Sequence, residues 1–87
     1  MKKYDSVWTI TFFDENQKLL VGLDNGWIEI FTIEGYSFIT FKAHNGSISA
    51  IKLLLDDTRL ATCSSDCTIN IFKFDKDYLK RFNPKPI

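Results

Sequence analysis

One sequence unit occurs twice in this chain. When the sequence is shifted by 41 positions, residues 6–41 align with residues 47–82 without a gap. The identical pairs are Ser6/Ser47, Ile10/Ile51, Leu19/Leu60, Ile28/Ile69, Ile30/Ile71, Phe31/Phe72 and Phe41/Phe82. A period of this length is typical of repeat architectures, in which each repeat is one supersecondary unit that needs its neighbours to cover its apolar face. The chain has 87 residues, so two such units account for most of it.

Short apolar runs separated by turn residues make up each unit. The runs are rich in β-branched and aromatic residues, which favours strands over helices. The expected strands are 7–13, 19–23, 27–33 and 37–42 in the first unit, and 48–55, 60–64, 68–74 and 78–82 in the second. Between the second and third runs, Asn25-Gly26 is a strong signal for a tight turn. We predict an all-β chain with four antiparallel strands per unit and no helix longer than a turn.

The size of the unit predicts the architecture. Four short strands with a period near 41 residues match one blade of a β-propeller. We therefore expect a first blade at 1–46, a second blade at 47–82 and an irregular tail at 83–87, where Pro84 and Pro86 lack the N–H that a strand ladder needs. A closed propeller has about four to eight blades, so two blades make an incomplete ring. Further blades from the same or another chain are expected partners, because two blades alone leave apolar faces open.

Charge and cysteine content argue against several functional classes. Eleven basic and eleven acidic residues give no net charge, which disfavours nucleic acid and anionic membranes as partners. No apolar run has the length of a membrane span, and the first residues lead into no secretory signal. Cys63 and Cys67 are too few for a disulfide scaffold, which indicates an intracellular, cytoplasmic protein. With His44 they form no metal-ligand pattern, and we expect neither a metal nor a cofactor.

Two stretches of the second unit resemble the WD-repeat β-propeller family. Residues 43–53 are similar to the family's Gly-His, a three-residue spacer and an apolar–x–x–apolar–x–apolar strand, with His44 at the His position. Residues 60–72 are similar to its small-residue strand, turn Asp and third strand, with Asp66 at the Asp position. The resemblance covers residues 6–82 and is stronger in the second unit. It departs where the family has Trp-Asp, because this sequence has Phe31-Thr32 and Phe72-Lys73 there.

The resemblance implies a hydrogen-bond network in the second blade. In the family, the network joins a His, a Ser or Thr, the turn Asp and the Trp of the third strand. Here His44 and Asp66 match, and the hydroxyl is that of Thr62 or Ser64. Phe72 has no indole N–H, so the network must stop before it. Such bonds would pin the loop that enters the blade and satisfy polar groups that packing buries.

The first unit lacks the same combination. Lys3 occupies its His position and Asn25 its Asp position, so we expect no such network there. A catalytic role for His44 and Asp66 with a nearby serine is the alternative to a structural one. That alternative is disfavoured because no G-x-S-x-G turn accompanies these serines.

The resemblance also implies a partner-binding face, formed where the first strand of each blade begins and where the second strand turns into the third. Carried over position by position, this face contains Ser6, Trp8, Asp24, Ser47, Ser49 and Ser65. Trp8 is a candidate anchor, because the second unit has only Ser49 there and Trp is enriched at binding hot spots. Packing of Trp8 against a neighbouring blade is an equally weighted alternative. The function implied is a protein-binding scaffold or adaptor; a purely structural subunit of a large complex is the alternative, and an enzyme is least favoured.

Overall fold

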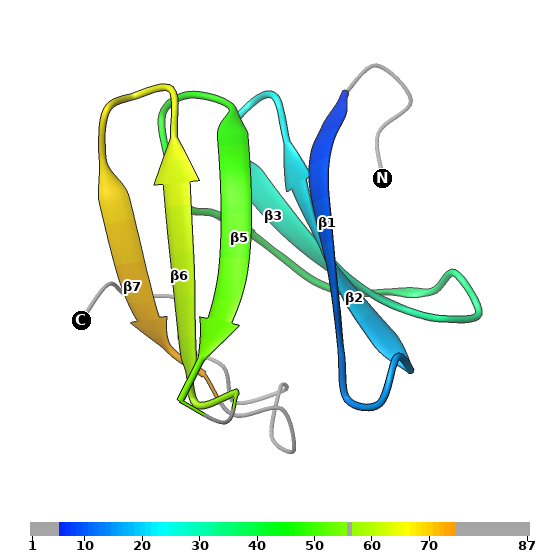
Figure 1. The fold of residues 1–87 in the computed structure, drawn as a ribbon. Coiled ribbons are helices and arrows are strands. Elements are labelled where there is room, and N and C mark those ends of the chain that lie inside the picture. The colour runs from blue at the N-terminus through cyan, green and yellow to red at the C-terminus, as the bar shows by residue number, and fades with distance from the viewer. Residues whose placement is uncertain (1–5, 56, 75–87) are drawn as a thin grey trace.

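The computed structural model describes residues 6–55 and 57–74, which form seven strands and no helix (Figure 1). The strands are β1 (Val7–Phe13), β2 (Lys18–Leu23), β3 (Trp27–Thr32), β4 (Ser37–Lys42), β5 (Ile48–Leu54), β6 (Arg59–Ser64) and β7 (Ile69–Lys73). They make two antiparallel sheets, in the order β1-β2-β3-β4 and β5-β6-β7. The predicted all-β class is confirmed. The strand expected at 78–82 and the tail expected at 83–87 lie outside the described residues.

Strand ends differ from the predicted ranges by a residue or two, for local reasons. β5 ends before Leu55, because that residue has a φ of 53° and belongs to a turn. β7 starts at Ile69 rather than Thr68, because the N–H of Thr68 donates to the side chain of Asp66. β3 stops at Thr32, whose carbonyl accepts the N–H of Gly35 in the next turn.

The first hairpin turn has the same backbone in both units. Asp14 and Asn16 have φ values of 53° and 67°, and the equivalent Leu55 and Asp57 have 53° and 62°. Positive φ values suit tight hairpin turns, because their twist matches that of the flanking strands. Leucine does not favour this conformation on its own. The repeat is therefore more regular in its backbone than in its sequence.

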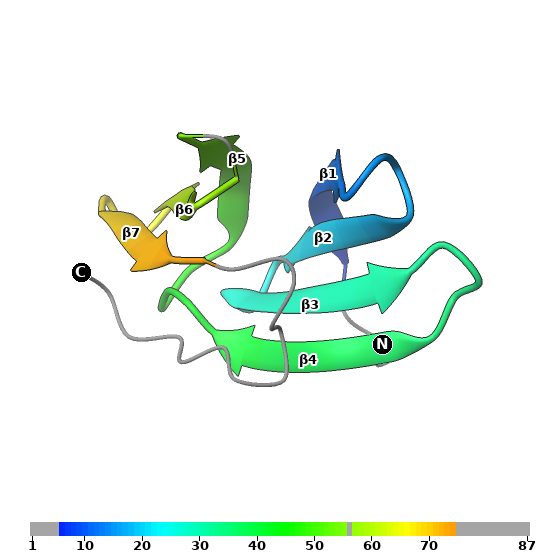
Figure 2. The same ribbon diagram turned by 90° about the horizontal axis from the view of Figure 1, so that it is seen from below.

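The two sheets pack face to face and diverge from a pair of neighbouring strands, β1 and β5 (Figures 1 and 2). Their shared core contains Phe13, Leu20, Ile28, Ile30 and Phe41 from the first sheet, and Ile48, Ile51, Leu60, Phe72 and Phe74 from the second unit. Two edge-to-face ring pairs cross it, Phe13–Phe74 and Phe41–Phe72, each with centroids 5.5 Å apart. Such pairs stabilise packing beyond the burial of their area.

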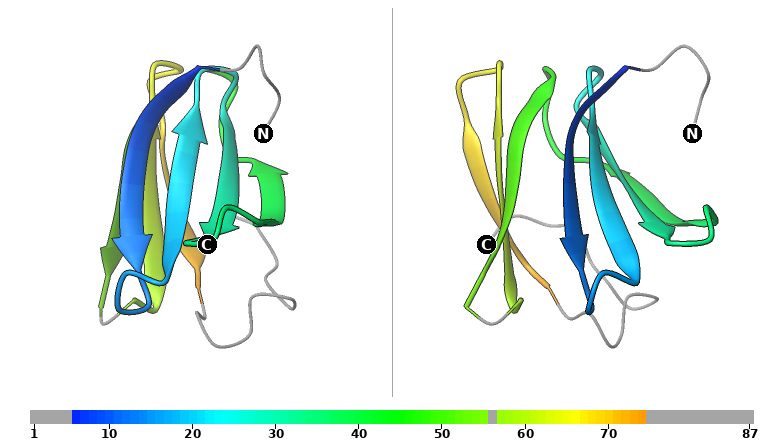
Figure 3. Two further views of the ribbon diagram at one scale, coloured as in Figure 1. Left: turned by 90° about the vertical axis from the view of Figure 1, so that its right-hand side faces the viewer. Right: turned by 45° about the vertical axis from the view of Figure 1, so that its right-hand side comes forward.

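Close backbone approach accompanies this packing. The hydroxyl of Thr11 on β1 donates to the carbonyl of Ile51 on β5, at 3.0 Å. A Cβ on Gly22 of β2 would lie 2.7 Å from Cγ2 of Ile48, so glycine is needed for β5 to pack this closely. Figure 3 shows the two twisted sheets side by side, without closure into a ring. The arrangement is that of two neighbouring blades of a partial propeller.

Candidate protein-binding face and its polar network

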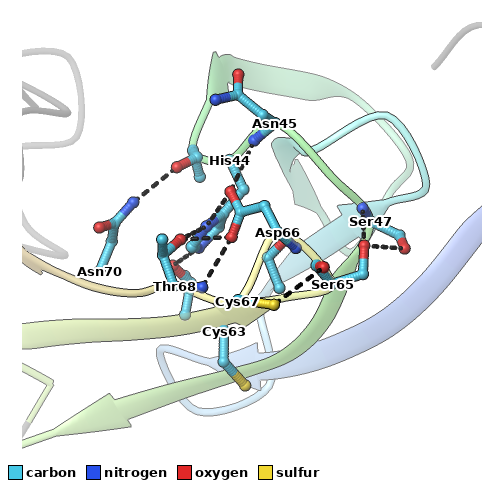
Figure 4. A network of polar contacts seen from close by, with 12 residues as sticks. His44, Asn45, Ser47, Cys63, Ser65, Asp66, Cys67, Thr68 and Asn70 are labelled. Atoms are coloured by element: carbon cyan, nitrogen blue, oxygen red, sulfur yellow. Dashed lines mark hydrogen bonds and ion pairs between the residues drawn. The ribbon is translucent and has the colours of Figure 1, made fainter.

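His44, in the linker between β4 and β5, is the centre of a polar network (Figure 4). Its ring is buried, and its Nε2 lies 2.7 Å from the hydroxyl oxygen of Thr62 on β6. Its Nδ1 lies 2.9 Å from the hydroxyl oxygen of Thr68 and 3.2 Å from a carboxylate oxygen of Asp66. The linker is thereby tied both to β6 and to the turn between β6 and β7.

Asp66 organises that turn through its carboxylate. It accepts the N–H of Asn45 at 2.9 Å and the N–H of Thr68 at 3.0 Å, and the Thr68 hydroxyl also donates to it. The Thr68 hydroxyl first, and the Asn45 N–H second, hold the pKa of Asp66 well below its usual range. The carboxylate is therefore ionised at neutral pH, when it is a pure acceptor for these donors.

The linker is also fixed by the first blade. The carbonyl of Gly26 accepts the N–H groups of Ala43 and His44, at 2.9 and 3.0 Å. The side chain of Asn70 on β7 donates to the carbonyl of Ala43 at 2.8 Å. Gly26 has a φ of 88°, and a Cβ there would lie 2.0 Å from the carbonyl oxygen of His44. Only glycine fits at this position. The Asn25-Gly26 turn predicted from the sequence therefore also holds the linker in place through its backbone.

The structure distinguishes between the two hydroxyls that the sequence offered for His44. Thr62 contacts the imidazole, whereas the Ser64 hydroxyl accepts the N–H of Asp66 at 3.1 Å. Sequence reasoning missed Thr68, although an Asp-x-Thr turn is a known signal for such bonds. It also missed Asn45, which contributes only its backbone N–H and leaves no side-chain signal.

Ser6 and Ser47 directly precede β1 and β5, and Asp24 and Ser65 follow β2 and β6 in the next turns. Figure 1 shows the starts of β1 and β5 and these two turns at the same end of the molecule. The N–H of Asp24 donates to the carbonyl of Ser6 at 2.9 Å, and the N–H of Ser65 donates to that of Ser47 at 3.1 Å. The Ser65 hydroxyl also accepts the N–H of Ser47, at 3.1 Å. Each unit therefore has an equivalent backbone hydrogen bond, which holds the start of its first strand beside the turn between its second and third strands.

Trp8 and Ser49 both occupy β-bulges. The pairing of β1 with β2 shifts between Val7 and Thr9, and the pairing of β5 with β6 shifts between Ile48 and Ala50. A bulge redirects a side chain away from the regular alternation of a strand. The Trp8 side chain is 61% exposed and takes no part in the core between the two described sheets. The sequence marked this position as unusual but gave no sign of the bulge.

Comparisons with known proteins agree with this geometry. The family described as WD domain, G-beta repeat (WD40) matches residues 35–73. Over 95% of its length the chain is 28% identical to periodic tryptophan protein 2 of Arabidopsis thaliana. Residues 35–73, a little under half of the chain, are thus similar to a WD repeat. The chain spans only about 10% of that relative's length.

Solved propeller structures show the same fold. The β-propeller domain of Cps50 (Swd1) from Myceliophteria thermophila matches 95% of this chain with a TM-score of 0.79 and 19% identity. A chain in a crystal structure of the mitotic checkpoint complex matches 83% with a TM-score of 0.70, also at 19% identity. This chain covers 27% and 22% of those two chains. Both matches concern the fold.

The WD-repeat match is offset from the blades. Residues 35–73 begin in the turn before β4 and end with β7, so the match includes the last strand of one sheet and three strands of the next. His44 and the linker lie inside this segment. Among residues 6–55 and 57–74, no helix is long and apolar enough to span a membrane, and no three His, Cys, Asp or Glu side chains are grouped to hold a metal ion.

Proposed function

We propose that this chain is a non-catalytic scaffold that binds protein or peptide partners inside the cell. Its binding face is the end of the molecule where β1 and β5 begin. The residues of this face are Ser6, Trp8, Asp24, Ser47, Ser49 and Ser65. The observation that carries the proposal is the exposed Trp8 side chain, held out on a bulge at that end.

The chemistry of the face suggests what it would bind. Trp8 offers a large apolar surface and an indole donor, a combination that is enriched at binding hot spots. Asp24 is exposed and offers an anionic acceptor beside the start of β1. We infer a partner segment with one apolar side chain for Trp8 and a nearby cationic or amide donor for Asp24.

A non-catalytic role is supported by how the candidate catalytic groups are used. Both ring nitrogens of His44 contact hydroxyl or carboxylate groups inside the blade, and the ring is buried. The half-buried Ser47 and the exposed Ser65 bond to each other. One structural neighbour is a chain of a multiprotein complex, which fits a binding role for this fold.

A peptide-selection experiment tests the binding face. Peptides from a displayed library are selected on the immobilised chain, and their affinity is measured for the wild type and for Trp8→Ala. We expect Trp8→Ala to cost about 2 kcal/mol or more of affinity, as hot-spot residues do, with the melting temperature unchanged. Tyr36→Ala is the matched control, since Tyr36 is also an exposed aromatic but lies in the turn between β3 and β4. Unchanged affinity with a large drop in melting temperature would make Trp8 a packing residue.

A purely structural subunit of a large complex is the second candidate. It is favoured by the exposed Ile69 and Ile71 on β7, which lie on the face of the second sheet away from the first. Salt screens exposed charge pairs much more than buried apolar contacts. Permanent partners should therefore stay bound at high salt and keep Trp8 protected from chemical labelling, whereas scaffold partners held in part by the charge of Asp24 should exchange more readily and expose it.

A further inference from the structure

The contact between the two sheets joins two different faces. We call the face of the first sheet that carries Leu20, Gly22, Ile28 and Ile30 its forward face. We call the face of the second sheet that carries Ile48, Ile51 and Leu53 its rear face. The forward face packs on the rear face to form the shared core. Because the units are repeats, each sheet has a forward face and a rear face. The forward face of the second sheet and the rear face of the first sheet are not packed against another sheet among the described residues.

The uncovered forward face belongs to the second sheet. Its residues Ala61, Cys63, Ile69 and Ile71 are equivalent to Leu20, Gly22, Ile28 and Ile30. The strand register is the same in both, since Cys63 pairs with Ile69 as Gly22 pairs with Ile28. Exposure differs sharply: Ile28 and Ile30 are 0% exposed, whereas Ile69 is 74% and Ile71 is 42% exposed. The difference therefore reflects the sheet that covers one face and not the other.

On the rear face of the first sheet, the side chains of β1 are exposed, whereas Val21 and Leu23 on β2 and Glu29 on β3 are buried. Val7, Ile10 and Phe12 on β1 are equivalent to Ile48, Ile51 and Leu53 on β5. Ile48 and Ile51 are buried and Leu53 is packed against the core, whereas Val7, Ile10 and Phe12 are all exposed. Residues 6–55 and 57–74 thus display apolar side chains equivalent to both halves of the interface that their two sheets build once.

The two uncovered faces differ from the closed pair in compensating ways. Gly22 is required because a Cβ would meet Ile48 and Thr9 at 2.7 Å. At the uncovered interface, Cys63 replaces the glycine, while the smaller Val7 and Ala50 replace Ile48 and Thr9. Likewise, Ala61 replaces Leu20 on the forward face, and the larger Phe12 replaces Leu53 on the rear face. Core packing tolerates such swaps best when total volume is conserved.

Different residues occupy the positions of the closed interface's polar contact at the uncovered faces. Thr11 donates to the carbonyl of Ile51 across the closed interface. Lys52 stands at the position of Thr11, and Ile10 at the position of Ile51. A lysine stem can lie along an apolar surface while its ammonium group stays in water at the rim. The charge of Lys52 is therefore compatible with packing at this face.

We propose that copies of this chain associate head to tail, with the forward face of the second sheet of one copy packed on the rear face of the first sheet of the next. The two surfaces are different, so the contact is heterologous and repeats along a series of copies. This interaction is separate from peptide binding at Trp8.

Two variants, each blocking one face, test this arrangement. Ile69→Lys places a charge on the forward face, and Ile10→Lys places one on the rear face; both side chains are exposed in a single copy, so both variants should fold. In sedimentation velocity at high micromolar concentration, the wild type should form species of several copies. Each variant alone should sediment at the monomer mass of 10.1 kDa. An equimolar mixture should form a species of twice that mass and none larger, because each variant retains one intact face.

Leu55→Lys is the matched control, since Leu55 in the turn after β5 is 72% exposed, close to the value for Ile69. It should assemble as the wild type does. Circular dichroism checks that each variant is folded, and Ile71→Lys and Phe12→Lys replace any that is not. A monomeric wild type, a mixture that stays monomeric, or single variants that still self-associate would each overturn the proposal. Peptide affinity measured on the monomeric Ile69→Lys chain keeps this test independent of the proposed binding function.

Discussion

The two blades share a backbone but hold their turns in different ways. In both blades, the side chain at the turn Asp position, Asn25 or Asp66, accepts the N–H two residues later, at 3.0 Å. In the first blade, the turn after β2 also relies on Gly26, whose missing side chain lets the linker backbone approach within hydrogen-bond distance. In the second, the equivalent turn has Cys67 and is held by the side chains of Asp66 and Thr68 around His44. One repeat position can thus be stabilised by close backbone contact or by a side-chain network, and only the latter resembles the family motif.

Gly26→Ala should have the largest effect on stability. The new Cβ meets the linker carbonyl and the residue has a φ of 88°, so strain and a steric clash act together. We expect a loss of about 3 kcal/mol or more in the free energy of unfolding, measured by urea titration. Gly35→Ala is the control for strain alone, because Gly35 has a φ of 98° but nothing lies within 4 Å of its added Cβ. Equal losses of unfolding free energy at the two glycines would show that the linker does not pack against Gly26.

His44→Ala should have the next largest effect. It removes the partner of Thr62 and of the Asp66–Thr68 turn from a buried position. We expect a loss of about 1–3 kcal/mol, the usual cost of leaving buried polar groups without partners. Lys3, the first-unit equivalent, lies outside the described residues. Lys3→Ala should change stability little, because the first unit has Asn25 in place of the turn Asp; equally small effects at both positions would argue against an operating network.

Cys67→Gly should produce a small gain. Cys67 has a φ of 72°, equivalent to the 88° of Gly26, and its side chain is exposed. Relief of left-handed strain outweighs the added freedom of glycine in the unfolded chain, so we expect a net stabilisation of about 0.5 kcal/mol. Thermal unfolding measures it, and Cys67→Ser controls for loss of the thiol with no expected gain. A lower melting temperature for Cys67→Gly would indicate that the thiol itself stabilises the turn.

Acidic pH should produce the smallest change in stability among these predictions. At neutral pH the Asp66 carboxylate is ionised in both the folded and the unfolded chain. Hydrogen bonds lower its pKa in the folded state below the ordinary value of about 3.9. The resulting stabilisation is complete above the ordinary pKa and is lost as pH falls toward the folded-state pKa. The melting-temperature gap between wild type and Asp66→Asn should therefore be constant near neutral pH and narrow below about pH 4. A gap that widens in acid would contradict the direction of the shift.

Several features of the fold could be predicted from the sequence because they depend on local patterns. The 41-residue period predicted the strands, and Asn25-Gly26 predicted a turn. The family resemblance identified His44 and Asp66 as two members of the polar network. Other features depend on how the two sheets meet. The choice of Thr62 as partner of His44 follows from the position of β6 under the linker. The need for glycine at position 22 arises only when Ile48 of the neighbouring blade lies against it.

The packing of the two units as neighbouring blades, on which both proposals depend, is tested most directly by nuclear Overhauser effects between aromatic rings. The rings of Phe41 and Phe72, and those of Phe13 and Phe74, come from different units and lie with their centroids 5.5 Å apart. The measurement is made on the monomeric Ile69→Lys chain, so that contacts between copies do not contribute. We predict cross-peaks between the ring protons of both pairs. Intact strand pairing within each sheet, with no cross-peak for either pair, would contradict the two-blade arrangement.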